Sequence, residues 1–194
     1  MSKDKRTLIM KALHSCIRDQ GYARTSLTDV GLAAKMSPSH VRYYFDGKEA
    51  ILEHYFETHC RQIVADIRAI PTEDPDEWFR RYVNYYIANP HIRSVALGVI
   101  VEIFGLAVHH DRLRAIKTAY DCEMLDILAQ FFESVGVAKA TPRHAAATTL
   151  ALEVGLKINA AFTENYDAEA NRETFVTLIE LLVGRRFEAQ RNED

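Results

Sequence analysis

Apolar residues recur along most of the chain at the three- and four-residue intervals of an α-helix. Near the N-terminus these intervals place six apolar side chains on one face: Leu8, Ile9, Ala12, Leu13, Cys16 and Ile17. Similar periods predict helices near 3–20, 27–34, 38–45, 48–69, 74–88, 91–106, 111–134, 142–162 and 168–189. No segment alternates polar and apolar residues as a β-strand does. The pattern therefore predicts an all-α protein of about nine helices.

Capping residues mark where several of these helices begin. Ser26 precedes one predicted helix, and Asp29 supplies an acid in its first turn. Ser37 stands before Pro38, which suits the first helical position because its missing N–H would have no partner there. Asp74-Pro75 repeats this arrangement. These signals separate two short helices, 27–34 and 38–45, from the longer ones around them.

The predicted helix 48–69 is too long to belong only to a small three-helix unit. At 1.5 Å per residue it spans about 30 Å. We therefore expect it to lead from a small domain, residues 1–47, into a larger helical domain, residues 48–194. The core of the small domain is expected to contain Ile9, Leu13, Ile17, Val30, Ala34, Met36, Val41, Phe45 and Leu52.

The two short helices and their connecting turn form a helix-turn-helix pattern, whose second helix can enter the major groove of DNA. This stretch resembles the DNA-binding domain of the TetR/AcrR family of transcriptional regulators. The resemblance is carried by Gly21-Tyr22, Thr25-Ser26, Asp29-Val30, Ala34, Met36-Ser37, Val41, Tyr44-Phe45, Lys48-Glu49 and Ile51-Leu52. Beyond this N-terminal quarter, the chain matches the family only in length and helical character. The resemblance implies a regulator that binds operator DNA.

Three residues depart from the family pattern. Lys35 replaces a glycine between the two short helices, so a lysine there must adopt a left-handed conformation or the turn must differ. Arg42 replaces a tyrosine that touches the DNA backbone, and arginine can contact a phosphate or reach a guanine edge. Gly31 replaces an alanine, which weakens its helix slightly.

We expect DNA contacts from residues of two kinds. Arg42 and Lys48 are expected to contact phosphates, with Ser26 and Tyr44 as neutral partners. Ser39, His40 and Tyr43, on the outward face of the second short helix, are the candidates for base contacts. The full predicted set is Ser26, Ser37, Ser39, His40, Arg42, Tyr43, Tyr44 and Lys48.

The larger domain contains features that are compatible with a ligand pocket. Glu102 interrupts the apolar run 91–106, and an unpaired buried carboxylate is unfavourable. An aromatic stripe on helix 74–88 fits either a pocket or an ordinary core. The candidate ligand-binding residues are Trp78, Tyr82, Tyr86, Glu102, Phe104, Met124 and Asn159. Glu153 has the same ambiguity between pocket and core.

The last two predicted helices have the composition of a subunit interface. Helix 142–162 is rich in small residues, which permit close helix contacts. Helix 168–189 contains a broad apolar stripe of Phe175, Leu178, Ile179, Leu182, Val183 and Phe187. The family resemblance implies a homodimer in which these helices form a four-helix bundle with their copies. The alternative is that both helices bury these faces within one subunit.

Charge is unevenly distributed along the chain, although the net charge is only −3. The first fifty residues contain nine basic and five acidic residues, and the remainder contains 15 and 22. A basic end on an acidic body suits a protein that presents one end to DNA.

Several other classes of protein are disfavoured by the sequence. It contains no phosphate loop, nucleophile elbow or zinc-protease motif, so no catalytic residues are expected. The adjacent His109 and His110 lack further ligands at metal-binding spacing, and neither a metal nor another cofactor is expected. The N-terminus lacks the apolar core of a signal peptide, and no apolar run is long enough to span a membrane. Three widely spaced cysteines indicate reduced thiols and a cytoplasmic location.

The leading hypothesis is therefore a dimeric, ligand-responsive transcriptional regulator, with repression favoured over activation. Its partners are expected to be double-stranded operator DNA, a small-molecule effector and a second copy of the chain, without a membrane. The competing hypothesis is an all-α enzyme or small-molecule carrier whose helix-turn-helix is only structural.

Overall fold

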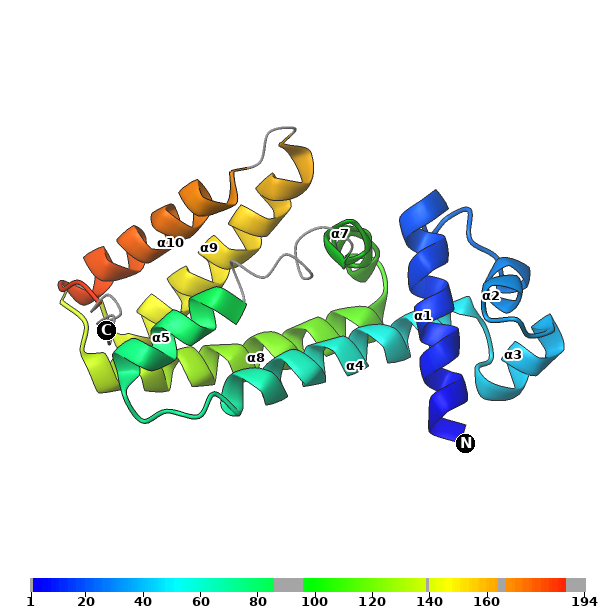
Figure 1. Ribbon diagram of the computed structural model, residues 1–194, viewed down its shortest axis with the longest axis horizontal. Coiled ribbons are helices and arrows are strands. Elements are labelled where there is room, and N and C mark those ends of the chain that lie inside the picture. The colour runs from blue at the N-terminus through cyan, green and yellow to red at the C-terminus, as the bar shows by residue number, and fades with distance from the viewer. Residues whose placement is uncertain (1, 86–95, 139, 164–166, 188–194) are drawn as a thin grey trace, which may run out of the picture. The chain divides into compact units, whose positions relative to one another are not determined.

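A computed structural model describes residues 2–85, 96–138, 140–163 and 167–187 (Figure 1). Within these ranges the chain forms α-helices and no β-strand. The helices are α1 (Ser2–Gln20), α2 (Leu27–Ala33), α3 (Pro38–Tyr44), α4 (Lys48–Arg68), α5 (Pro75–Val83), α7 (Ala96–Ala107), α8 (Asp111–Val135), α9 (Pro142–Phe162) and α10 (Ala168–Val183). The predicted all-α fold is confirmed.

The chain divides into two compact units. The first comprises residues 1–63 and 94–119, and the second comprises residues 64–93 and 120–194. Helices α4 and α8 each contribute residues to both units. The predicted domain boundary between residues 47 and 48 stays a prediction.

The core of the first unit forms where α1 packs against α2, which in turn packs against α3 (Figure 1). Eight of the nine predicted core residues are buried: Ile9, Leu13, Ile17, Val30, Ala34, Val41, Phe45 and Leu52. The prediction was wrong for Met36, whose side chain is only half-buried. Met36 lies in the turn after α2, where its main chain packs closely against Gly31 and its side chain stays partly in solvent.

Helix boundaries follow the predicted capping residues. Asp74 accepts a hydrogen bond from the N–H of Asp76 at 3.0 Å, and Pro75 occupies the first position of α5. Thr141 caps α9 in the same way, accepting from the N–H of His144 at 3.3 Å. These bonds supply partners for N–H groups that have none within a helix. The predicted beginning of helix 91–106 lies outside the described residues.

The last described helix is shorter than predicted. Helix α10 ends at Val183, not near residue 189, because Gly184 adopts a left-handed conformation with φ +83°. Phe187 therefore does not belong to the helical stripe. Its ring lies 4.1 Å from that of Phe79, centroid to centroid, and Arg185 pairs with Asp76 at 2.5 Å.

Aromatic rings from distant parts of the sequence form the centre of the second unit. Phe79 stacks on Phe131 at 5.5 Å and on Phe175 at 6.3 Å between ring centroids. All three side chains are buried. Burying each contributes about 1.5–3 kcal/mol to folding. Contacts between α5, α8 and α10 therefore hold this unit together.

Candidate functional site

The start of α2 has the reciprocal bonds of a capping box. The hydroxyl of Ser26 accepts a hydrogen bond from the N–H of Asp29 at 3.2 Å. In return, the N–H of Ser26 donates to the Asp29 carboxylate at 2.8 Å. These two hydrogen bonds fix the residue at which α2 begins.

The turn between α2 and α3 depends on two unusual backbone positions. Lys35 adopts a left-handed conformation with φ 55°, which confirms one of the two predicted possibilities. Gly31 permits a close approach, since a Cβ there would lie 2.8 Å from the carbonyl oxygen of Met36. The glycine therefore does more than weaken α2. It allows the turn to close over the helix.

Helix α3 presents a polar and aromatic outer surface. Its first turn is capped by the Ser37 hydroxyl, which accepts from the N–H of His40 at 3.1 Å. Tyr43 is 81% exposed, and its ring meets that of Tyr44 edge-on at 5.0 Å. Other exposed members of the predicted DNA-binding set are Ser26, Ser37, Ser39, His40 and Arg42, whereas Tyr44 is half-buried. Both caps fix the direction in which this surface faces.

Lys48 has a structural position that the sequence did not reveal. Its ammonium donates to the carbonyl oxygens of Tyr22 and Thr25 at 3.0 and 2.9 Å. The same nitrogen lies 4.3 Å from the centre of the Tyr22 ring. Lys48 thus holds the connection between α1 and α2, in addition to its predicted contact with phosphate.

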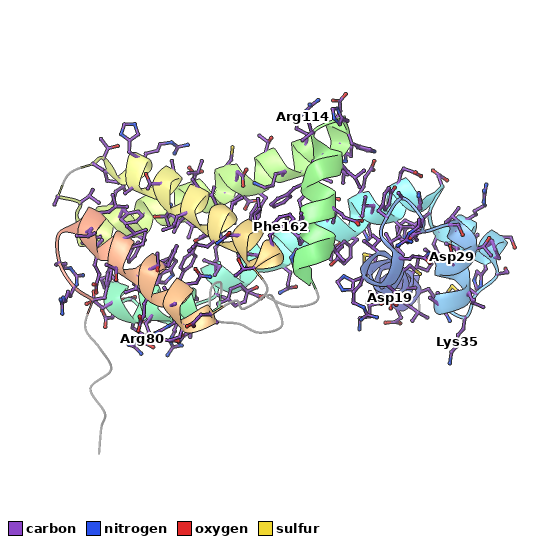
Figure 2. The ribbon with its side chains drawn as sticks, turned by 90° about the horizontal axis from the view of Figure 1, so that it is seen from above. Asp19, Asp29, Lys35, Arg80, Arg114 and Phe162 are labelled. Carbon is purple, nitrogen blue, oxygen red and sulfur yellow. The ribbon has the colours of Figure 1, made fainter. Side chains whose placement is uncertain are left out.

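One exposed cation was not included in the predicted set. Lys35 extends from the turn away from the helices (Figure 2). Its position beside the start of α3 allows it to meet a phosphate. The sequence does contain a signal for it: a lysine stands in the turn directly before α3.

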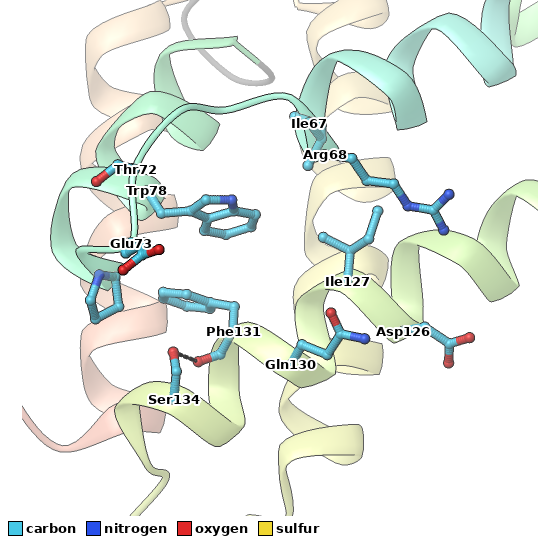
Figure 3. Close-up of a pocket in the computed structure, with 11 residues that line it drawn as sticks. Ile67, Arg68, Thr72, Glu73, Trp78, Asp126, Ile127, Gln130, Phe131 and Ser134 are labelled. Carbon is cyan, nitrogen blue, oxygen red and sulfur yellow. Dashed lines mark hydrogen bonds between the residues drawn. The ribbon is translucent and has the colours of Figure 1, made fainter.

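The second unit contains a hollow with a volume of ≈ 390 Å³. Figure 3 shows the indole of Trp78 above the ring of Phe131. Below them, the Ser134 hydroxyl donates a hydrogen bond to the Phe131 carbonyl oxygen. Two charged groups at the rim are already ion-paired: Arg68 with Glu123 at 3.1 Å, and Asp126 with Arg143 at 2.9 Å. The lining residues are Ile67, Arg68, Thr72, Glu73, Pro75, Trp78, Asp126, Ile127, Gln130, Phe131 and Ser134.

A buried acid lies next to this aromatic group. Trp78 stacks on Tyr82 at 5.1 Å, and the hydroxyl of Tyr82 donates to Oε1 of Glu153. Both Tyr82 and Glu153 are 0% exposed. Burial raises the pKa of Glu153 to about 7, although the charge of Lys157 and the bond from Tyr82 oppose the rise. Burial also raises the pKa of Tyr82, so this hydroxyl remains a donor.

Glu102 lies in the first unit and contacts backbone. Its Oε2 accepts a hydrogen bond from the N–H of Tyr22 at 2.7 Å, and the residue is exposed. Its other oxygen would lie 3.1 Å from a Cβ at Gly21, which has φ +80°. The carboxylate therefore ties α7 to the turn that follows α1.

The predicted ligand-binding residues are divided between the two units, and their role in binding stays a prediction. Glu102 and Phe104 belong to the first unit, and Trp78, Tyr82, Met124 and Asn159 belong to the second. Met124 is fully buried, whereas Asn159 is exposed. Tyr86 lies outside the described residues. Phe131 was missed, because no local pattern separates a residue of the hollow from an ordinary core residue.

An outward stripe of small and apolar residues lies along α9. Its members recur at helical spacing and are all exposed: Ala147, Ala151, Gly155, Ile158 and Phe162. On α10, Leu178 and Leu181 are 41% and 66% exposed. Leu182, another member of the predicted apolar stripe, is half-buried.

Comparison with protein families identifies both parts of the chain. Residues 9–55 match the model described as bacterial regulatory proteins, tetR family. Residues 75–184 match the C-terminal model of BetI-type transcriptional repressors. The chain belongs to the TetR family of transcriptional regulators. Proteins of this family are generally not enzymes. A search of curated protein sequences found no match.

Solved structures of other regulators share the fold. A TetR transcription regulator from Haloarcula marismortui is 17% identical, with a TM-score of 0.84 over 93% of this chain and 98% of that one. The fatty acid degradation regulator FadR from Bacillus halodurans is 19% identical, with a TM-score of 0.76 over 90% and 94%. NalD, the secondary repressor of the MexAB-OprM multidrug efflux pump in Pseudomonas aeruginosa, is 17% identical, with a TM-score of 0.70 over 93% and 98%.

Among the residues that the structure describes, none of the helices combines the length and the hydrophobicity needed to span a bilayer. In the same ranges, no three His, Cys, Asp or Glu side chains gather in a way that could hold a metal ion.

Proposed function

We propose that this TetR-family protein is a dimeric repressor that binds operator DNA through α3 and releases it when a small molecule binds the second unit. The observation that carries the proposal is the exposed surface of α3, which begins at the Ser37 cap and bears the exposed Tyr43 near its end. Repression is favoured over activation because the matched C-terminal model and NalD are both described as repressors.

The DNA contacts follow from position and charge. Arg42 and Lys35 are exposed cations on α3 and in the turn before it, which suits contacts to phosphates. Ser39, His40 and Tyr43 are exposed on α3 and are proposed to meet base edges. Lys48 can add a phosphate contact at the start of α4, where backbone N–H groups also favour an anion.

Dimerisation is proposed through α9 and α10. The exposed α9 stripe offers small side chains along which a second helix can pack closely, and Phe162 is 74% exposed at its end. Leu178 and Leu181 extend the apolar surface on α10. Exposed apolar residues in such a continuous arrangement are typical of subunit interfaces. A two-fold dimer would present two copies of α3 to successive half-sites, about 34–36 Å apart.

The effector is proposed to bind in the second unit, near Trp78 and Tyr82. The hollow combines apolar side chains such as Ile67, Trp78 and Phe131 with polar ones such as Thr72, Gln130 and Ser134, and small-molecule sites use both kinds of group. The signal can reach the DNA-binding helices by two routes. Helix α4 contributes to both units, and Glu102 on α7 holds the Tyr22 N–H directly after α1. Either route must give two states with different operator affinities.

Selection from a random pool of duplex DNA tests the proposal. We expect the wild type to enrich one sequence with two-fold symmetry, and Tyr43→Ala to enrich a changed sequence while keeping its salt dependence. Arg143→Ala, which alters an exposed arginine of the second unit, is the control and should enrich the wild-type sequence. Operator binding would be contradicted if the protein retained DNA without enriching any sequence, or if it retained no DNA at low salt.

A further inference from the structure

Glu153 is a fully buried acid with only part of its hydrogen-bonding capacity used. It lies on α9 and is 0% exposed, and Oε1 accepts from Tyr82. Among the described residues, Oε2 has no hydrogen-bond partner. Lys157, one helical turn further along α9, acts on the carboxylate through its charge without satisfying this oxygen.

Such an arrangement is unfavourable unless something completes it. A buried polar atom without a partner costs about 1–3 kcal/mol, and more when it is charged. A core residue of similar shape without polar atoms would avoid this cost. Methionine would fill the same space on α9. The presence of a glutamate at this position therefore indicates that Oε2 has a hydrogen-bond partner that is not among the described residues.

The surroundings of Glu153 restrict what that partner can be. Tyr82 places an aromatic ring beside the carboxylate, and Trp78 stacks on Tyr82. Tyr120, 7% exposed, is near enough to Tyr82 to add to the rise of its pKa. Aromatic faces and a carboxylate in a water-poor site both attract a cation. Apolar rings also accept a hydrocarbon body.

We propose that the effector is an organic molecule with a protonated amine and that Glu153 selects it. The amine donates an N–H···O hydrogen bond to Oε2. This inference rests on the proposed effector-binding function. Trp78 and Tyr82 hold the hydrocarbon part of the ligand, and Glu153 recognises its charge. Glu102, the other acid among the candidate pocket residues, accepts a hydrogen bond from the Tyr22 N–H.

The only tryptophan in the sequence provides a direct probe of this site. Because Trp78 stacks on the ring that bonds Glu153, a ligand bound there should change its fluorescence. The full-length protein is titrated with primary alkylamines of four to ten carbons and with 2-phenylethylamine. Each amine is compared with the alcohol of the same skeleton, which has no charge. The same titrations are run on Glu153→Gln.

Glutamine preserves the shape of the site and can still accept from Tyr82, so the variant separates charge from packing. Glu133→Gln is the matched control, because Glu133 is an exposed acid on α8 in the same unit. We expect saturable fluorescence changes with at least one amine, and affinity for its alcohol lower by about 10-fold or more. Glu153→Gln should lose the preference for the amine, and Glu133→Gln should keep it.

Two results would overturn the inference. One is that no amine in the series binds saturably, and the other is that Glu153→Gln binds the amine as tightly as the wild type. Mass spectrometry of molecules that co-purify with the protein distinguishes this failure from failure of the effector hypothesis. A neutral co-purifying molecule that binds wild type and Glu153→Gln equally would leave an effector-responsive regulator and remove the role of Glu153.

Discussion

The two units each contain a glutamate within an apolar helix, and these glutamates have different environments. Glu102 on α7 of the first unit is exposed and accepts an N–H from the backbone of Tyr22. Glu153 on α9 of the second unit is fully buried, and a tyrosine hydroxyl is its partner. The same residue type therefore serves as a contact to the main chain in one unit and as a buried acid in the other.

The difference extends to how each unit is held together. In the first unit, capping and turn residues within a few positions of one another set the geometry of α2 and α3. In the second, the rings of Phe131, Phe175 and Phe187, all distant from Phe79 in sequence, stack on the Phe79 ring. The geometry of α2 and α3 therefore depends on local hydrogen bonds, whereas the second unit depends on contacts between residues that are distant in the sequence.

The largest effect is expected from a charge placed on the proposed subunit interface. Leu181→Glu should give a monomer and weaken operator binding by about 100-fold or more, because two linked half-site contacts become one. Leu181 is preferable to the half-buried Leu182, where a charge would also disturb the core. Val108→Glu, at an exposed apolar residue of the first unit, is the control. Analytical ultracentrifugation that finds Leu181→Glu dimeric would place the interface elsewhere.

The second effect is a pH dependence of stability that comes from Glu153. The folded pKa of about 7 lies above the ordinary 4.5, so between these values the folded state holds a proton that the unfolded state has lost. Stability should therefore be greatest below pH 4.5 for this group and fall as pH rises to 7, by about 3 kcal/mol in total.

Glu153→Gln removes this titration. Chemical denaturation from pH 4.5 to 8 should show the wild type losing stability relative to the variant as pH rises. Glu133→Gln should follow the wild-type profile. If the difference between wild type and Glu153→Gln does not change with pH, the acid titrates near its ordinary value and its burial does not govern its chemistry.

A third change separates the two roles of Lys48, which are to stabilise the fold and to contact DNA. Lys48→Met removes the ammonium that holds the carbonyl oxygens of Tyr22 and Thr25, while keeping most of the hydrocarbon chain. We expect a loss of about 1–3 kcal/mol in unfolding free energy, since these are hydrogen bonds to a charged group. Thermal denaturation without DNA measures the loss. An unchanged melting temperature would leave phosphate contact as the role of this residue.

Arg42→Ala should weaken DNA binding without lowering stability, the reverse of the effect expected for Lys48→Met. Because Arg42 is exposed on α3, its loss should leave stability nearly unchanged. Operator binding should weaken for all sequences alike, and the slope of log K against log salt should fall by about one unit. Arg143→Ala should leave this slope unchanged. A change in the preferred sequence instead would assign Arg42 to a base contact.

The smallest effect is expected from Glu102→Gln. The amide oxygen of glutamine can still accept from the N–H of Tyr22, so stability should change by less than about 1 kcal/mol. The pH profile of stability should match the wild type, in contrast to Glu153→Gln. If Glu102→Gln instead abolishes binding of the effector while the fold remains intact, Glu102 binds ligand as the sequence analysis first predicted.

The first unit was largely predictable because its signals are local. Ser26 with Asp29, and Ser37 with Pro38, specify helix starts through hydrogen bonds that span three residues. The left-handed backbone at Lys35 followed from the two short helices that it joins. Helical periodicity also identified the buried face of α1, since residues one turn apart share a side whatever else they contact.

The second unit was predictable in its helices but not in its chemistry. Glu102 and Glu153 both lie in apolar stretches of the sequence, and the stretches do not distinguish them. In the folded chain, Glu153 is buried against Tyr82, whereas Glu102 accepts a hydrogen bond from the N–H of Tyr22. The tertiary structure likewise decided that Leu181 is exposed where Leu182 is not. The reason is physical: burial depends on which distant helices cover a side chain, and periodicity within one helix does not specify its neighbours.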